Sequence, residues 1–308
     1  MQLHASIDDA ARAGALKGLA VALGNFDGVH KGHQALIARA RAQAAAAVLT
    51  FDPHPGKVLQ PELAPRLITT RARKLELLAQ AGVSQAVVQP FSLEYARTTA
   101  ARFESDLFDA LGVGHVVVGQ DFTYGEKRSG TLPTLIKAAQ GRGARVHVVD
   151  PVTLDGIPVS STRVRQFVLE GRVAQAAQLL GRPFDLDGVV VAGQGRGRTI
   201  GFPTANVDTP NELRPAPGVY AVRVQVGGAG PWRGGAANIG VKPTFGGGAV
   251  TIEAHLFDFS GDLYKATLRV QFLDRLRAEQ RFASAQELAQ QISRDLERAR
   301  EAVARTAQ

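Results

Sequence analysis

The sequence predicts two domains: an α/β domain with a parallel sheet, followed by an antiparallel β-barrel with a C-terminal helix. A length of 308 residues exceeds the usual size of a single hydrophobic core. In the first half, short apolar runs alternate with helical patterns, which indicates βαβ units. After Gly181, glycine-rich and β-branched segments without helical periodicity replace this pattern, and such segments are typical of a compact barrel.

In the first domain the strands are uniformly apolar, as expected where helices cover both faces of a sheet. We expect these strands at 19–23, 48–51, 86–89, 115–118 and 145–149. Helices are predicted near 34–46, 71–81, 99–111 and 132–140.

The barrel is expected within 184–272, after a linker at Arg182-Pro183, so the domains are 1–182 and 183–308. The tail then forms a helix. Ser284 and Glu287 have the spacing of a capping box at its start. Apolar residues at i, i+4 spacing give this helix an apolar stripe: Leu288, Ile292 and Leu296.

Composition excludes several classes of protein. The chain has no cysteine, which removes disulfides, thiolate metal sites and cysteine nucleophiles. No apolar run approaches the ~20 residues of a membrane span, and the N-terminus lacks the apolar core of a secretory signal. We therefore expect a cytoplasmic protein without a membrane partner. The net charge of +8 is scattered along the chain, which favours phosphate-rich small ligands over nucleic acid.

The segment 24–33 (GNFDGVHKGH) joins a predicted strand to a predicted helix. Such a turn directs backbone N–H groups and the positive helix end toward a ligand. Gly24, Gly28 and Gly32 let the backbone approach phosphates, and His30 and His33 can stabilise charge on them. A metal-binding histidine pair would need i, i+4 spacing and a nearby carboxylate, so phosphate binding is the favoured interpretation.

A second segment, VSSTRVR at 159–165, starts another helix. Hydroxyl side chains and two arginines at a helix start can bind phosphate through side-chain and backbone donors. A plain helix cap with solvated arginines is the alternative.

In the barrel, Gly193, Gly195 and Gly197 form a flap whose N–H groups could surround a phosphate tail. Thr204 and Asn206 face the same side of an extended strand, where their oxygens suit Mg²⁺.

Glu253 is an acidic residue within an otherwise apolar strand, 252–257. Burying an unpaired carboxylate is costly, so Glu253 is a candidate for chemistry. An ion pair with a barrel arginine is the alternative. His255 shares its face and is expected to support the site rather than to react.

The first half resembles the FMN adenylyltransferase domain of prokaryotic bifunctional riboflavin kinase/FAD synthetases, a Rossmann-like nucleotidyl-transferase. The motifs are GNFDGVHKGHQ, TFDPHP at 50–55, VGQDFTYG at 118–125 and VSSTRVR. The resemblance implies that His30, His33 and Arg163 act on the ATP phosphates in adenylyl transfer. It implies further nucleotide-binding residues: Gly24, Asn25, Phe26, Asp27, Gly32, Asp121, Ser161, Thr162 and Arg165.

The second half resembles the riboflavin kinase domain of the same family, through PTAN at 203–206, NIGVKPTF at 238–245 and IEAHLFDF at 252–259. The resemblance implies that Thr204 and Asn206 bind magnesium-ATP, with Gly195 and Gly197 nearby, and that Glu253 is the general base. The implied substrates are ATP, riboflavin and FMN, and the implied cofactor is Mg²⁺.

Lys265 stands where the family usually has glycine, which leaves the conformation of that turn open. Two other functions are alternatives to the synthesis of FMN and FAD. The turn at 24–33 binds nucleotide whatever the acceptor, so a different acceptor such as phosphopantetheine or glycerol phosphate is an alternative. An OB-like nucleic-acid module would need exposed aromatic residues, and aromatics form only 6% of the chain. The oligomeric state is not predicted.

Overall fold

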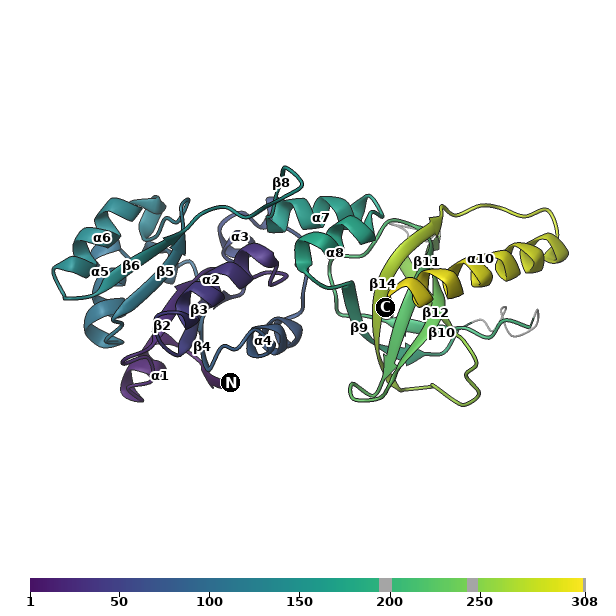
Figure 1. Cartoon of the computed structure of the whole chain (residues 1–308), viewed down its shortest axis with the longest axis horizontal. Coiled ribbons are helices and arrows are strands. Elements are labelled where there is room, and N and C mark those ends of the chain that lie inside the picture. Colours follow the sequence, from purple (N-terminus) through teal and green to yellow (C-terminus); the bar gives the residue numbers. More distant parts are fainter. Residues whose placement is uncertain (194–200, 243–248, 307–308) are drawn as a thin grey trace. The chain divides into compact units, whose positions relative to one another are not determined.

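The computed structural model describes residues 1–193, 201–242 and 249–306. The chain forms two compact units, residues 1–161 and 162–308 (Figure 1). Among the residues described, no helix has the length and apolar character that crossing a membrane requires.

The first unit is built on a parallel sheet in the order β1-β4-β3-β2-β5-β6, which confirms the predicted sheet. Its strands are β1 (Gln2–His4), β2 (Ala20–Leu23), β3 (Ala46–Asp52), β4 (Gln85–Pro90), β5 (His115–Gly119) and β6 (Arg145–Val149). Its helices are α1 (Ile7–Arg12), α2 (Lys31–Arg41), α3 (Pro55–Leu59), α4 (Arg71–Gln80), α5 (Ala100–Ser105) and α6 (Leu132–Gln140). Short turns are η1 (Pro61–Leu63), η2 (Tyr95–Arg97), η3 (Asp106–Ala110) and η4 (Glu126–Arg128), and β7 (Thr153–Leu154) pairs with β8 (Ile157–Pro158).

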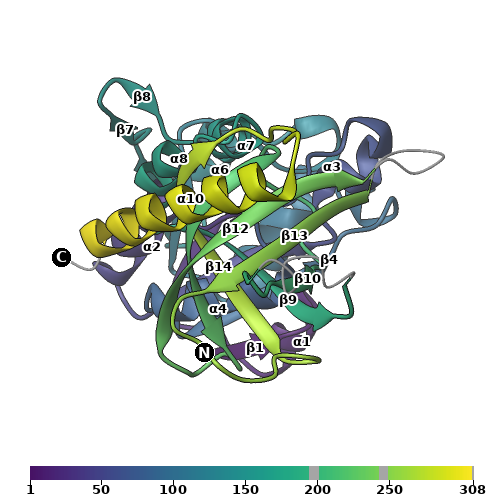
Figure 2. The same cartoon turned by 90° about the vertical axis from the view of Figure 1, so that its right-hand side faces the viewer.

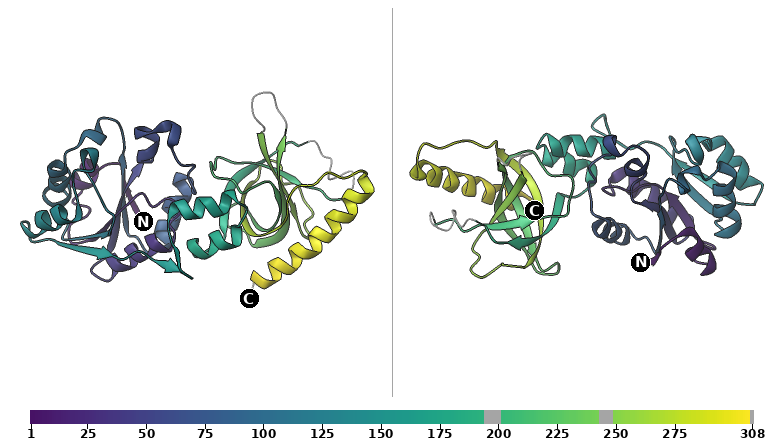
Figure 3. Two further views of the ribbon diagram at one scale, coloured as in Figure 1. Left: turned by 90° about the horizontal axis from the view of Figure 1, so that it is seen from above. Right: turned by 180° about the vertical axis from the view of Figure 1, so that it is seen from behind.

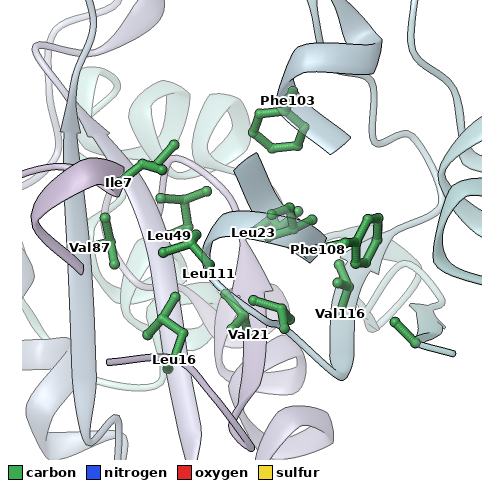
Figure 4. Close-up of a cluster of buried hydrophobic side chains, with 14 of the residues drawn as sticks. Ile7, Leu16, Val21, Leu23, Leu49, Val87, Phe103, Phe108, Leu111 and Val116 are labelled. Atoms are coloured by element: carbon green, nitrogen blue, oxygen red, sulfur yellow. The ribbon is translucent and has the colours of Figure 1, made fainter. Parts of the chain in front are cut away.

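Alternate residues of the central strands supply two separate cores, one on each face of the sheet. Figure 4 shows the core in which Val21 and Leu49 meet Phe103 and Phe108 of the α5–η3 segment. On the opposite face, strand residues such as Val48 pack with Leu78 of α4 and with Ile37 of α2. Burial on both faces explains why the strands read as uniformly apolar.

One helix prediction needs correction. The alanine-rich helix expected at 34–46 is α2, which begins at Lys31 and ends at Arg41, and Ala46 already belongs to β3. Pairing of β3 with its neighbours and burial in the core outweigh the helical preference of alanine there. The helix expected at 99–111 is confirmed: α5 is continued without a break by η3, which is a π-helical turn.

The second unit contains a closed barrel in the order β10-β13-β12-β11-β14-β9, as predicted; the left view of Figure 3 looks along its axis. Its strands are β9 (Phe184–Val191), β10 (Ala205–Asp208), β11 (Gly218–Val226), β12 (Trp232–Lys242), β13 (Ala249–Leu256) and β14 (Thr267–Arg277). Helices α7 (Ser161–Leu169) and α8 (Val173–Leu180) precede the barrel. The backbone N–H of Ala216 donates to the carbonyl of Val168, so α7 is tied to the barrel unit, which begins before the linker predicted at Arg182-Pro183.

The tail helix α10 (Ala285–Thr306) lies across the outside of the barrel (Figure 2). Ala299 and Ala302 of α10 pack on Ala221 and Ala236 of the strands. The Ser284 hydroxyl caps the helix by accepting from the Glu287 N–H at 3.2 Å. The other half of the predicted capping box is displaced by one residue, because the Glu287 carboxylate accepts from the N–H of Ala283 rather than from that of Ser284.

Lys265 has a φ of 64°. Its turn therefore holds a non-glycine residue in the left-handed conformation, at a cost of about 1–2 kcal/mol.

The titration of His147 should make the stability of the sheet unit depend on pH. Burial first, and then the positive charge of Arg39 with further electrostatic contributions from His115 and Arg145, lowers the pKa of His147 from 6.5. Arg39 donates to His147 Nδ1 at 3.3 Å, and the other ring nitrogen lies 3.0 Å from His115 Nδ1. A folded-state pKa below the unfolded value stabilises the fold above pH 6.5, and this contribution is lost as pH falls through the folded pKa.

We expect the free energy of unfolding, measured by calorimetry between pH 8 and pH 5, to fall less steeply with decreasing pH in His147→Gln than in the wild type. The difference in slope should correspond to roughly one titrating group. The only tryptophan, Trp232, lies in the barrel, so its fluorescence separates the transition of the barrel from that of the sheet unit. An identical acid limb in both proteins would contradict the assignment.

Candidate active sites

The parallel sheet changes its winding direction at β2, which pairs with β3 on one side and β5 on the other. In open α/β sheets, ligands bind beyond the carboxyl ends of the strands at such a point. The turn at 24–30 leaves β2 at this edge, and Asp121 follows the end of β5 at Gly119 (Figure 1). The fold therefore brings the predicted turn and Asp121 to one edge of the sheet.

The turn has an unusual backbone. Phe26 and Val29 are buried non-glycine residues with φ of 51° and 42°, and each left-handed residue costs about 1–2 kcal/mol. Gly28 has a φ of 83°, and a Cβ there would lie 2.9 Å from Ile68 Cδ1. Contacts outside the turn must therefore hold this conformation.

Asp27 supplies those contacts. Its carboxylate is 3% exposed and accepts hydrogen bonds from the backbone N–H of Ile68 at 3.0 Å and of Thr69 at 3.2 Å. The Ser161 hydroxyl donates to the Asp27 carbonyl at 2.9 Å. Asp27 thus fixes the turn to the segment before α4, and Ser161 contacts the turn; its predicted role on the triphosphate stays a prediction.

The two histidines lie together at the start of α2. His30 is the N-cap residue, and its Nδ1 accepts from the His33 backbone N–H at 3.3 Å. The rings stack with centroids 3.7 Å apart. Because His30 Nδ1 accepts, neutral His30 carries its proton on Nε2, where it can donate to an anion.

Phe26 and the glycines support the histidines. The Phe26 ring is fully buried and lies 5.2 Å from His33. Gly24 lies beneath that ring, and Gly32 lies against the His30 ring. In the parts of the chain that the structure describes, no three His, Cys, Asp or Glu side chains gather to hold a metal ion, so the described residues form no zinc-type cluster around this pair.

A buried lysine lies behind the turn. Lys74 of α4 is 9% exposed, and its ammonium donates to the Asn25 carbonyl at 3.4 Å, the Thr50 hydroxyl at 3.4 Å and the Phe51 carbonyl at 3.3 Å. The Thr50 hydroxyl in turn donates to the Asn25 carbonyl at 3.1 Å. Burial lowers the pKa of Lys74, against the opposing influence of the Asp52 and Asp27 carboxylates.

A hollow opens beside this network, lined by Asn25, Asp27, Phe51, Asp52, His54, Leu67, Thr69, Arg71 and Lys74. It combines an aromatic ring with cationic and hydroxyl groups. Arg71 lies 3.4 Å from the Asp52 carboxylate at its rim. Asn25 and Asp27 of the turn are part of its lining, so the hollow lies at the same sheet edge as the turn.

The remaining residues of the phosphate clamp lie in α7. Arg163 donates to the Gln166 side chain at 2.8 Å, and Thr162 is exposed. Thr162, Arg163 and Arg165 belong to the second compact unit. That they meet the turn at 24–33 stays a prediction.

In the barrel, strand register aligns three polar residues. Glu253 of β13 is directly opposite Asn206 of β10 and also directly opposite Asn238 of β12. Directly paired residues share a face of the sheet, so the carboxylate lies between two carboxamides. All three are half-buried, and within the described residues Glu253 makes no ion pair. The arginine partner considered as an alternative is thus not found there.

The approach to this row is closely packed. A Cβ on Gly193 would lie 1.9 Å from Asn206 Nδ2, so only glycine lets the carboxamide lie against the backbone. His255 Nδ1 lies 2.8 Å from the Pro203 carbonyl and ties the residue before Thr204 to β13. The supporting role expected of His255 thus has a physical basis. Gly195 and Gly197 lie outside the described residues.

Two family models match the chain. Residues 13–163 match FAD synthetase, and residues 180–303 match riboflavin kinase. The chain is 41% identical to the bifunctional riboflavin kinase/FMN adenylyltransferase of Pseudomonas fluorescens, over 92% of this chain and 93% of that protein. It is 40% identical to that of Escherichia coli K12, with the same coverage. The chain belongs to the bifunctional riboflavin kinase/FMN adenylyltransferase family.

A solved structure is also similar. The crystal structure of a protein described as a macrolide-efflux protein from Streptococcus pneumoniae has a TM-score of 0.83 and 34% sequence identity, covering 90% of this chain and 92% of that one. The likeness extends over both compact units. This member of the bifunctional family therefore carries its FAD synthetase part first and its riboflavin kinase part second.

Sequence reasoning missed Lys74, Thr50 and Asn238 at the two sites. A signal for Lys74 exists: it precedes Leu77 and Leu78 by three and four residues, so it lies on the buried face of α4. A lysine on such a face needs a polar partner. Asn238 lies within a family motif, but only the strand register reveals that it faces Glu253.

Replacing Gly193 tests the packing of the kinase site. Gly193→Ala places a methyl group within 1.9 Å of the Asn206 amide, so Asn206 must move. We expect kcat/KM for ATP in FMN formation to fall about tenfold or more, a loss of ~1.4 kcal/mol or more. FAD formation from supplied FMN should not change. Kinase activity within twofold of the wild type would contradict the geometry.

Proposed function

We propose that the barrel unit of this bifunctional enzyme phosphorylates riboflavin and that the sheet unit adenylylates the resulting FMN, through the residues named below. The observation that carries the proposal is the occurrence of two sites in one chain: stacked histidines on a strained strand-to-helix turn, and a carboxylate between two carboxamides in a barrel.

In the sheet unit, a phosphate oxygen of FMN attacks the α-phosphorus of ATP, the bond to the bridging α,β-oxygen breaks, and pyrophosphate leaves. His30 and His33 donate to the phosphate oxygens as negative charge builds on them. Arg163 and Arg165 act with Ser161 and Thr162 on the triphosphate. Positioning and charge stabilisation supply the rate, without a covalent enzyme intermediate.

Other residues shape the nucleotide site. Asn25 and Asp27 fix the turn by their backbone and carboxylate contacts, and Asp121 contacts the nucleotide or its metal ion. Gly24, Phe26 and Gly32 set the positions of the histidines.

In the barrel unit, Glu253 takes the proton of the ribityl 5′-hydroxyl. The resulting oxygen attacks the γ-phosphorus of ATP, and ADP leaves. Thr204 and Asn206 hold magnesium-ATP, and Gly195 and Gly197 are assigned to its phosphates. Hydroxyl and carboxamide oxygens are donors that Mg²⁺ accepts, with substrate phosphates and water as its other ligands. When bound, Mg²⁺ supplies neutralising charge to the phosphates.

ATP, riboflavin and FMN are the proposed partners of the chain, and neither nucleic acid nor membrane is assigned. The scattered positive charge supports small anionic ligands. We place the enzyme in the cytoplasm, where ATP is available.

Product analysis tests the two activities together. The purified chain, given only riboflavin, ATP and MgCl₂, should convert riboflavin to FMN and then to FAD, which chromatography of the flavins would measure. In a separate assay, pantetheine phosphate or glycerol phosphate supplied as the acceptor in place of FMN should give no adenylylated product. Accumulation of FMN alone, with oxidised or reduced flavin, would refute adenylyl transfer to FMN.

Reciprocal variants test the residue assignments. His30→Ala should lower FAD formation by about 10²–10⁴ while FMN formation is retained. Glu253→Ala should do the reverse, since a general base contributes about 10²–10⁴. Each variant is assayed with riboflavin and, separately, with supplied FMN. The assignment of the base is wrong if Glu253→Ala keeps kinase turnover within about tenfold of the wild type.

A further inference from the structure

Behind the histidine turn, one buried side chain joins the carboxyl ends of β2 and β3. Lys74 reaches from α4 to the Asn25 carbonyl after β2 and to the Phe51 carbonyl within β3. Thr50, which is fully buried, accepts from Lys74 and donates to the Asn25 carbonyl. These groups form a closed network of hydrogen bonds behind the turn.

We propose that Lys74 is a positioning residue for adenylyl transfer: its ammonium, with the Thr50 hydroxyl, holds the Asn25 carbonyl and thereby sets the placement of His30 and His33. The inference rests on the proposed function of the sheet unit and adds a residue that its chemistry does not itself require.

The position of Asn25 explains the effect at a distance. Asn25 immediately precedes Phe26, the first left-handed residue of the turn. A strained conformation persists only where surrounding contacts fix it. The Asn25 carbonyl belongs to the peptide that leads into Phe26, so a change in its orientation would alter the path of the turn toward the N-cap at His30. The Asp27 carboxylate fixes the turn on the side of Ile68 and Thr69, and Lys74 fixes it on the side of the sheet.

Charge also favours a lysine at this position. Burial lowers the pKa of Lys74, and the Asp52 and Asp27 carboxylates oppose this effect by favouring its ammonium form; Asp27 is itself 3% exposed. An ammonium with hydrogen bonds to three oxygens satisfies its donors in a buried place, where an unpaired cation would be costly. A neutral side chain of the same length would keep the packing and lose the hydrogen bonds.

The test is a double-mutant cycle of Lys74→Met and Thr50→Val, with kcat and KM measured for FAD formation from supplied FMN. If both residues act through the Asn25 carbonyl, their effects are not additive. We expect Lys74→Met to lower kcat about tenfold or more with KM for FMN within threefold, and Thr50→Val to lower kcat about threefold. The double variant should be no slower than Lys74→Met.

Controls distinguish positioning from instability and from failure of the proposed function. Lys137→Met removes a charge from an exposed site on α6 and should leave both activities unchanged, and FMN formation should be unchanged in every variant. If Lys74→Met does not fold, Thr50→Val alone must still lower kcat. Multiplicative effects, or Lys74→Met within twofold of the wild type, would overturn the inference. Absence of FAD formation in the wild type would instead refute the proposed function.

Discussion

The buried carboxylate of Asp27 is the interaction on which the sheet site depends. It accepts from the backbone of Ile68 and Thr69, so it joins the turn after β2 to the segment that leads into α4. The turn contains left-handed residues that are not glycine, and it would relax without such a tie. Strain of this kind persists only where surrounding contacts fix it, and such sites are often functional. Here the strained turn ends at the His30 cap, so the Asp27 contacts contribute directly to where the imidazoles lie.

The parallel sheet and the barrel could both be predicted from the sequence, because the burial of strand faces determines the pattern of apolar and polar residues along each strand. Apolar runs such as 116–118 and alternating segments such as 184–191 indicate which faces are covered. The predictions were wrong where local preference and tertiary pairing disagree. Ala46 belongs to a strand although alanine favours helices, because β3 pairs on both sides in the interior of the sheet.

Site residues could be predicted only where the chain places them in one motif. His30 and His33 are neighbours in sequence, so their stacking follows from one helix start. The contact between Lys74 and Asn25 spans 49 residues and depends on how α4 crosses the sheet edge. Likewise, Asn206, Asn238 and Glu253 become neighbours only through the register of three strands. A shift of one residue would turn their side chains to opposite faces, and no local pattern fixes that register.

The two sites differ in one respect that the chemistry of their nucleophiles explains. A ribityl hydroxyl is a weak nucleophile, so transfer to it gains from a base, and the barrel site presents Glu253 without an ion-pair partner among the described residues. The FMN phosphate is already anionic at neutral pH, since its second pKa is about 6. A carboxylate facing it would repel it. In the sheet unit the Asp27 carboxylate is instead directed to backbone N–H groups, and the Asp52 carboxylate, which also lines the hollow, lies 3.4 Å from the Arg71 guanidinium. The stacked imidazoles of His30 and His33 are the groups that we propose to face phosphate. On this proposal the barrel site needs a base for its acceptor, whereas the sheet site needs donors to an acceptor that is already anionic.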